Sequence, residues 1–202
     1  MHELILGGVR SGKSRAAESR AARWLAGAGP AAAARREALL IATALPGDDE
    51  MRARIARHVA GRAARLPALR TLEAAQGLAA VIAAQTRPER LLVVDCLTLW
   101  LTQLLLPPAA AQDASDATAV ADLADPAAAV QRLLAALDAA TGPLVLVANE
   151  VGLGVLPPAA EARRCVDALG ELQRAVAARC ARVTLMVAGR ELPLPPPTGA
   201  AP

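Results

Sequence analysis

The chain has 202 residues, 54% of them hydrophobic and 20% charged, which suffices for one domain with a sizeable core and excludes wholesale disorder. Its net charge of +3 comes from acidic and basic residues that are mixed along the chain, and it has two Trp, no Phe and no Tyr. It therefore lacks the block of like charge and the aromatic platforms that favour a nucleic-acid partner.

Three cysteines, Cys96, Cys165 and Cys180, are an odd number without the short paired spacings of zinc or redox motifs. We therefore expect free, buried thiols in a reducing compartment. No basic leader precedes an apolar run, and no apolar stretch approaches the roughly 20 residues that a membrane helix needs. These features predict a cytoplasmic protein without a membrane span.

Short apolar runs alternate with longer Ala-, Leu- and Arg-rich segments of helical period, which predicts an α/β domain with a mostly parallel sheet flanked by helices. Strands are expected at Leu4–Leu6, Leu39–Ala44, Leu91–Leu97, Pro143–Ala148 and Arg182–Ala188. Helices are expected at Lys13–Ala28, Asp48–Ala64, Ala74–Gln85, Thr98–Leu106, Ala127–Ala140 and Ala159–Arg179.

The domain is expected to span residues 1–192. Within it, the stretch 107–126 is rich in Ala, Asp and Pro and predicts a surface insertion in loop form. The last residues, 193–202, are Pro-rich without a hydrophobic period and predict a flexible tail.

The first predicted strand runs directly into a loop that matches G-x-x-x-x-G-K-[ST] at every specified position. Its glycines let backbone N–H groups turn toward a phosphate, and the following helix adds its positive N-terminal end. Lys13, the only lysine in the chain, would bridge the β- and γ-phosphates, and Ser14 would hold Mg²⁺. The flanking strand and helix argue against a chance match. This phosphate loop consists of Gly7, Gly8, Val9, Arg10, Ser11, Gly12, Lys13 and Ser14.

Asp95 follows the apolar run 91–94 at the carboxyl end of the third predicted strand. P-loop proteins place at this position the acid that holds Mg²⁺ or its water shell. Any strand can end in Asp, so the residue alone indicates little. Beside a phosphate loop it predicts a second magnesium ligand.

The second predicted helix carries a histidine between two arginines. Arg54, His58 and Arg62 are spaced four residues apart and therefore share one face of the helix. The two cations could bind a polyphosphate and favour the neutral imidazole, which is able to attack phosphorus. The alternative is a solvated charged face on an arginine-rich protein, and the spacing alone favours that alternative.

Asn149 and Glu150 follow the fourth predicted strand and precede a glycine-bearing loop. Open α/β sheets bind ligands at this edge. Glu150 could act as a base or metal-shell ligand, and Asn149 could hydrogen-bond a substrate. A plain turn from strand to loop is equally consistent with the sequence.

Together these segments resemble the bifunctional adenosylcobinamide kinase and adenosylcobinamide-phosphate guanylyltransferase family of cobalamin biosynthesis. The resemblance covers nearly the whole chain. Its motifs are Gly7–Ser14, Ile41–Ala44, Asp49–Met51 with Arg54, Ile55 and His58, Arg70–Glu73, Val94–Thr98, Asn149–Gly152 with Pro157, and Val187–Arg190. Two positions depart from the family pattern: Ala63 stands where a proline is frequent, and Arg57 where some members have a second histidine.

The resemblance implies a RecA-like P-loop NTPase fold and a homotrimer with sites near subunit boundaries. It implies that His58 accepts GMP from GTP covalently, with Lys13 and Asp95 as further catalytic residues and Ser14 and Asp95 as ligands of Mg²⁺. The implied substrates are adenosylcobinamide, its phosphate, and ATP or GTP. Beyond the phosphate loop, the implied nucleotide contacts are Ala42, Thr43, Ala44, Val59, Ala60, Gly61, Arg62, Glu73 and Asp95.

Two other hypotheses stay open. The chain could be a simple small-molecule kinase in which His58 is a surface residue and no covalent nucleotide adduct forms. It could also be a non-catalytic switch, in which bound nucleotide alters a partner-binding surface and hydrolysis is slow.

Overall fold

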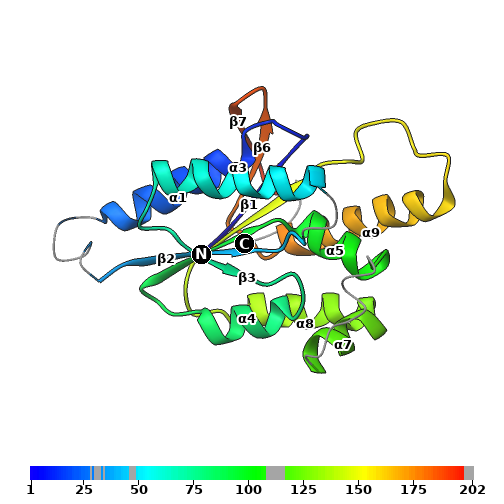
Figure 1. Cartoon of the computed structure of the whole chain (residues 1–202), viewed down its shortest axis with the longest axis horizontal. Helices are drawn as coiled ribbons and strands as arrows, with labels where there is room; N and C mark the ends of the chain where they lie inside the picture. The colour runs from blue at the N-terminus through cyan, green and yellow to red at the C-terminus, as the bar shows by residue number, and fades with distance from the viewer. Residues whose placement is uncertain (28, 30–32, 34, 46–48, 108–116, 198–202) are drawn as a thin grey trace.

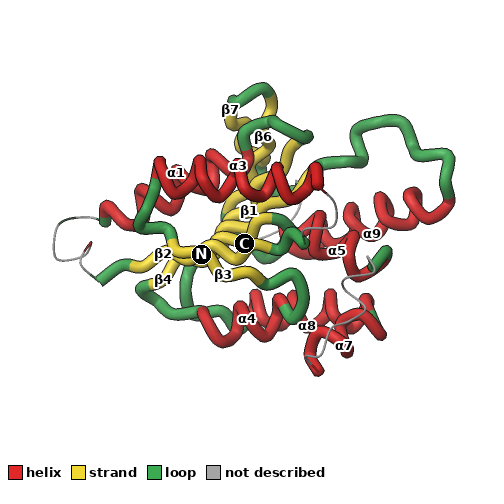
Figure 2. Tube along the Cα trace, viewed as in Figure 1, coloured by secondary structure: helices red, strands yellow, loops and turns green. Residues whose placement is uncertain are grey.

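The computed structural model describes residues 1–27, 29, 33, 35–45, 49–107 and 117–197. These residues form one seven-stranded sheet with helices on both faces (Figures 1 and 2). The strands are β1 (His2–Gly7), β2 (Glu37–Ala42), β3 (Arg70–Glu73), β4 (Arg90–Asp95), β5 (Leu144–Asn149), β6 (Arg182–Val187) and β7 (Arg190–Leu194). The helices are α1 (Lys13–Ala26), α3 (Asp49–Arg65), α4 (Leu78–Gln85), α5 (Leu97–Leu105), α7 (Ala117–Ala124), α8 (Pro126–Asp138) and α9 (Ala160–Ala177).

The strand order is β3-β2-β4-β5-β1-β6-β7. All neighbouring strands pair in parallel except β7, which pairs antiparallel to β6. Strand β5 lies between β1, which leads into the phosphate loop, and β4, which ends in Asp95. The mostly parallel α/β sheet predicted from the alternation of apolar and helical segments is confirmed.

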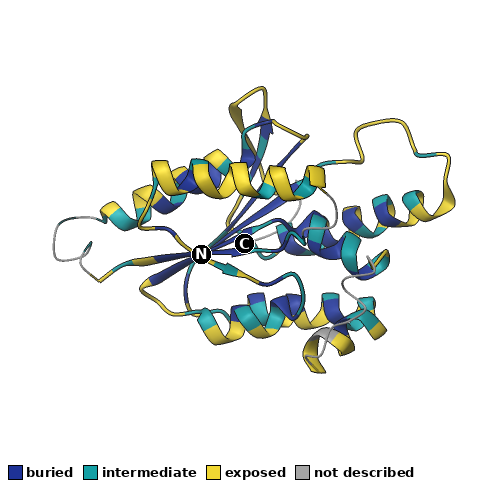
Figure 3. Ribbon diagram, in the orientation of Figure 1, coloured by how far each residue is buried: buried dark blue, intermediate teal, exposed yellow. Residues whose placement is uncertain are grey.

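Two apolar layers hold the sheet, because the central strands bury side chains on both faces (Figure 3). Trp100 of α5 and Leu133 of α8 lie in the layer that joins one face to α4, α5, α8 and α9. Ala17 and Ala21 of α1 pack in the other layer against the opposite face. The sheet packed between these layers positions the ends of its strands.

Two strands were not predicted, and both lie at edges of the sheet. Strand β3 has no fully buried residue, and all five residues of β7 are exposed. Neither therefore carries the continuous apolar run that marks a buried strand. Strand β7 also extends to Leu194, two residues into the segment expected to be a flexible tail, of which residues 198–202 lie outside the described part of the chain.

The insertion expected at 107–126 as a loop contains helix α7. The side chain of Asp122 holds it against its neighbours by accepting hydrogen bonds from the Gly77 backbone N–H at 3.1 Å and the Arg132 guanidinium at 2.6 Å. Residues 108–116 of this insertion lie outside the described ranges. None of the described helices is both long and apolar enough to cross a bilayer.

The carboxyl ends of the five strands β1 to β5 lie along one edge of the sheet, since all five run in the same direction. The phosphate loop follows β1 there, and Asp95 and Asn149 end β4 and β5. Residues far apart in the sequence therefore meet at this edge, which is where parallel sheets bind ligands.

Candidate active site

The phosphate loop depends on glycine at two positions. A Cβ at Gly7 would lie 2.5 Å from the backbone oxygen of Met186, and Gly12 has a φ of +104° where α1 begins. The β6–β7 turn supports the loop, because the Gly189 N–H donates to the Ser11 carbonyl at 2.9 Å. The loop is thus fixed between β1, α1 and β6.

Lys13 points back across this loop. Its Nζ donates a hydrogen bond of 2.6 Å to the Gly8 carbonyl, and the residue is only 7% exposed. Burial lowers the pKa of the Lys13 ammonium, while the nearby Cys96 and Asp95 act in the opposite direction. The loop therefore contains a desolvated cation whose ammonium makes one hydrogen bond to the described residues.

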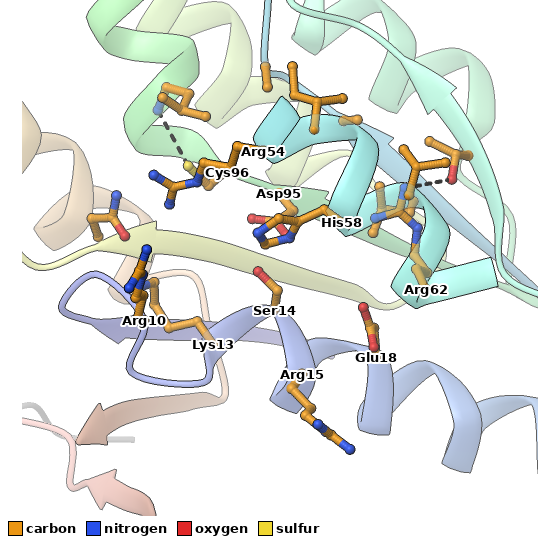
Figure 4. Close-up of a pocket in the computed structure, with 18 of the residues that line it drawn as sticks. Arg10, Lys13, Ser14, Arg15, Glu18, Arg54, His58, Arg62, Asp95 and Cys96 are labelled. Carbon is orange, nitrogen blue, oxygen red and sulfur yellow. Dashed lines mark hydrogen bonds between the residues drawn. The ribbon is translucent and has the colours of Figure 1, made fainter. Parts of the chain in front are cut away.

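A cavity of about 400 Å³ opens above the phosphate loop. The loop forms one side of it and α3 the other, and Figure 4 shows His58 over Asp95 and Ser14. Of the residues expected to bind nucleotide or act in catalysis, those that line the cavity are Val9, Arg10, Ser11, Gly12, Lys13, Ser14, Ala42, Ala44, His58, Val59, Arg62, Glu73 and Asp95.

Five of the expected nucleotide contacts, Gly7, Gly8, Thr43, Ala60 and Gly61, do not line the cavity. Gly7 and Gly8 lie at the base of the phosphate loop. Ala60 and Gly61 point away from the inner face of α3, whereas His58, Val59 and Arg62 lie on that face, because residues three and four positions apart share one face of a helix. Thr43 is completely buried behind the cavity wall.

Ser14 and Asp95 present a hydroxyl and a carboxylate to the same cavity. No group of three or more His, Cys, Asp or Glu side chains that could hold a metal occurs among the described residues. Mg²⁺ does not need such a cage, because it is bound through one or two protein oxygens together with phosphate oxygens and water. This donor set fits Mg²⁺.

Arg54, His58 and Arg62 share the inner face of α3, as their spacing predicted, and all three line the cavity, which the spacing alone did not indicate. His58 is exposed, whereas Arg62 is the one buried residue of α3 and donates to Thr71 Oγ1 at 3.2 Å. One turn further, Nε and Nη2 of Arg65 each donate a hydrogen bond of 2.9 Å to the Glu18 carboxylate of α1. Hydrogen bonds from Arg62 and Arg65 thus hold α3 in place near its carboxyl end.

Sequence reasoning missed several residues of the cavity wall. Glu18 follows Ser14 by four positions on α1, so helical periodicity could have placed it beside the site. Asn149, for which two interpretations were open, lines the cavity; Glu150 does not, and its carboxylate accepts from the Gly152 N–H at 2.7 Å. The lining residues without an assigned role were Arg15, Glu18, Leu40, Met51, Ile55, Arg65, Thr71, Cys96 and Leu99.

The phosphate loop follows β1, and Asp95 ends β4, which is separated from β1 by β5. These two features define a RecA-like P-loop NTPase domain. The model of one family of such enzymes, cobinamide kinase / cobinamide phosphate guanyltransferase, matches residues 3–194. The chain belongs to this family.

Three curated relatives support this family membership. The chain is 44% identical over 196 residues to the bifunctional adenosylcobalamin biosynthesis protein CobP of Pseudomonas aeruginosa, covering 96% of this chain and 97% of that protein. It is 36% identical to the bifunctional adenosylcobalamin biosynthesis proteins CobU of Salmonella typhimurium and Escherichia coli, in each case over 92% of this chain and 95% of the relative. A solved ATPase from a bacterial type III secretion system aligns with a TM-score of 0.46 at 15% identity, over 91% of this chain and 50% of the other.

Proposed function

We propose that the protein phosphorylates adenosylcobinamide with ATP or GTP and then transfers GMP from GTP to the product, giving adenosylcobinamide-GDP and pyrophosphate. One observation carries the proposal: the phosphate-loop residues Lys13 and Ser14, the carboxylate of Asp95 and the imidazole of His58 all line one cavity. A phosphoryl-transfer site and a candidate covalent nucleophile are therefore within reach of the same nucleotide.

In the kinase reaction, the aminopropanol hydroxyl attacks the γ-phosphorus, the bond to the β–γ bridging oxygen breaks, and the hydroxyl proton is released. Lys13 and the loop N–H groups bind the phosphate oxygens as charge shifts toward the leaving nucleoside diphosphate. Ser14 and Asp95 would hold Mg²⁺, which when bound neutralises phosphate charge. Burial of Lys13 excludes water from its ammonium and strengthens its attraction to phosphate.

In the transferase reaction, a ring nitrogen of His58 attacks the α-phosphorus of GTP, and the bond to the α–β bridging oxygen breaks to release pyrophosphate. A phosphate oxygen of adenosylcobinamide phosphate then attacks the same phosphorus and breaks the phosphorus–nitrogen bond, which frees His58. Arg54 and Arg62 flank the imidazole on the cavity face of α3 and offset the charge of the triphosphate. The exposure of His58 suits a nucleophile that must reach two substrates in turn.

Assembly as a homotrimer in the cytoplasm belongs to the same proposal. The loop after β5 supports a subunit contact, because Val151, Leu153, Val155 and Leu156 are all exposed there. Apolar side chains gathered on one loop are a feature of protein interfaces.

The test is incubation of the protein with Mg²⁺ and GTP labelled at either the α- or the γ-phosphorus. We expect acid-labile, base-stable label from the α position alone, and none with His58→Ala. Arg57→Ala is the matched control, since Arg57 is the exposed neighbour of His58, contacts the Ala53 carbonyl and does not line the cavity. Nucleotide binding without retained α-label would contradict the transferase half. Corrinoid phosphorylation without adduct would indicate a simple kinase, and neither activity would indicate a nucleotide switch.

A further inference from the structure

Thr43 occupies an unusual place for a polar residue at the binding edge of the sheet. It follows β2 directly, is 0% exposed and does not line the cavity. Its hydroxyl donates to the Cys96 carbonyl at 2.7 Å and accepts from the Cys96 N–H at 2.8 Å. One hydroxyl thus satisfies both backbone groups of the residue that follows Asp95.

The backbone of Thr43 makes two further hydrogen bonds to the β4–α5 region. Its N–H donates to the Asp95 carbonyl at 3.1 Å, one step beyond the last registered pair of β2 and β4, Ala42 and Asp95. On the other side, the Gln103 side chain reaches from α5 and donates to the Thr43 carbonyl at 3.0 Å. Three hydrogen bonds therefore tie the end of β2 to the turn between β4 and α5, and a fourth ties it to Gln103 within α5.

The position of the Asp95 carboxylate depends on this backbone. Within the described parts of the chain no side chain or backbone group hydrogen-bonds its carboxylate oxygens, although the residue lines the cavity. The carboxylate is thus oriented by the main chain from which it projects. That main chain hydrogen-bonds to Thr43 through the Asp95 carbonyl and through the N–H and carbonyl of Cys96. A metal ligand must be held within a fraction of an ångström to be effective.

We propose that Thr43 is a positioning residue: it holds the backbone at Asp95 and Cys96 so that the Asp95 carboxylate meets the magnesium–nucleotide complex. The proposal rests on the proposed function, in which Asp95 is a magnesium ligand. A direct contact between Thr43 and nucleotide is the competing explanation. The burial of Thr43 and the use of its hydroxyl as both donor and acceptor argue against that explanation.

Three variants separate positioning from general stability. Thr43→Val keeps the shape and removes the hydroxyl, and Thr43→Ser keeps the hydroxyl. Thr184→Val is the matched control, because Thr184 is also a buried strand-associated threonine, bonds Glu3 at 3.2 Å and lies outside the cavity wall. GTP affinity is measured by calorimetry across a magnesium titration and again with the metal chelated, alongside kinase activity.

We expect Thr43→Val to raise the half-saturating Mg²⁺ concentration about tenfold and to leave metal-free GTP binding within about twofold, a change small beside the metal effect. Thr43→Ser should restore the wild-type magnesium dependence, and Thr184→Val should leave it unchanged even if it lowers the melting temperature. Equal weakening of GTP binding with and without metal would overturn the proposal in favour of direct contact. A Thr43→Val protein with wild-type magnesium dependence would overturn it in favour of a purely structural role.

Asp95→Asn distinguishes failure of this inference from failure of the proposed function. If Asp95→Asn leaves the magnesium dependence unchanged, the proposed metal site is wrong and the Thr43 proposal falls with it. The two residues act as one unit if Asp95→Asn raises the half-saturating Mg²⁺ concentration and Thr43→Val raises it by no more than about a further twofold in the Asp95→Asn background. Should Thr43→Val not fold, Gln103→Leu decides: an increased magnesium requirement supports the proposal, and an unchanged one overturns it.

Discussion

The Glu18 carboxylate accepts two hydrogen bonds of 2.9 Å from the Arg65 guanidinium, which joins the helix that begins at Lys13 to the last turn of the helix that carries His58. Glu18 is buried and Arg65 is partly exposed. Arg62 is the one buried residue of α3, and this ion pair links the last turn of that helix to α1 on the phosphate-loop side of the cavity. The two halves of the site are therefore coupled by a charge pair.

Removing either partner should have unequal effects. Arg65→Ala leaves a buried carboxylate without its partner and should lower the free energy of unfolding by about 2 kcal/mol. Glu18→Ala leaves only a partly exposed guanidinium, so its cost should be about 1 kcal/mol. Urea unfolding of both variants checks the order, and a larger loss for Glu18→Ala would contradict it.

Lys13→Met should separate activity from stability. The variant loses the ammonium that binds phosphate, so kcat of the kinase reaction should fall by at least about 100-fold. The pKa of Lys13 is lowered by burial, which means that the folded protein disfavours its charge, and removal of the charge should leave the melting temperature equal or higher. Arg23→Met, an exposed position on the same helix, is the control. A marked loss of stability in Lys13→Met would contradict this account.

Glu3 should contribute to the acid sensitivity of the fold. Burial acts to raise the pKa of the Glu3 carboxyl, but its hydrogen bonds and charge interactions with Arg20, Arg182 and Thr184 lower it overall from the ordinary value of 4.5. The unfolded chain then binds the proton more readily, so the stabilisation is present above about pH 4.5 and is lost as the pH falls through the folded-state pKa. Glu3→Gln should lose less stability than the wild type between about pH 6 and pH 3. Urea midpoints across this range test it.

The two arginines beside His58 should differ in importance. Arg62 is buried and fixed by Thr71, whereas Arg54 is exposed. A fixed guanidinium is worth more to a developing phosphate charge than a mobile one, so Arg62→Ala should slow guanylylation of His58 by about 10- to 100-fold and Arg54→Ala by less. Thr71→Val removes one hydrogen-bond acceptor of Arg62 but leaves the guanidinium buried, so it should change the rate by less than about threefold. Single-turnover labelling measures each rate, and equal effects of the two arginines would argue against the role of burial.

The exposed loop after β5 offers a test of assembly. Leu153 is 81% exposed and Val155 98% exposed, so neither contributes to packing within the chain. The pair of substitutions Leu153→Asp and Val155→Asp should leave the secondary structure intact and reduce the sedimenting mass from about three times 20.6 kDa to one. A wild-type protein that sediments as a monomer would contradict the trimer.

The buried strands could be predicted because β1, β2, β4, β5 and β6 carry continuous apolar runs or alternating apolar residues, which are typical of strands buried on two faces or on one. The edge strands could not. Their conformation is set by a neighbour across the ladder, β2 for Arg70–Glu73 and β6 for Arg190–Leu194, and not by their own hydrophobicity. Helix α7 was missed for a similar reason, since Asp122 contacts Gly77, which lies 45 residues away in the sequence, and Arg132 of α8.

The site shows the same division. Lys13, Ser14 and Asp95 were predicted as site residues from local motifs. His58 was predicted as a site residue from the resemblance of its helix to a known family. Thr43 was expected to touch nucleotide because it lies within the motif at the end of β2. Its hydroxyl hydrogen-bonds the backbone of Cys96, 53 residues further along the chain, and no local sequence pattern predicts such a contact.

A single cavity bounded on one side by the phosphate loop and on the other by α3 has a pharmacological consequence. A compound that fills it contacts the surroundings of both Lys13 and His58. Inhibitors of the two reactions should therefore compete with each other, and one compound should block both with a shared inhibition constant.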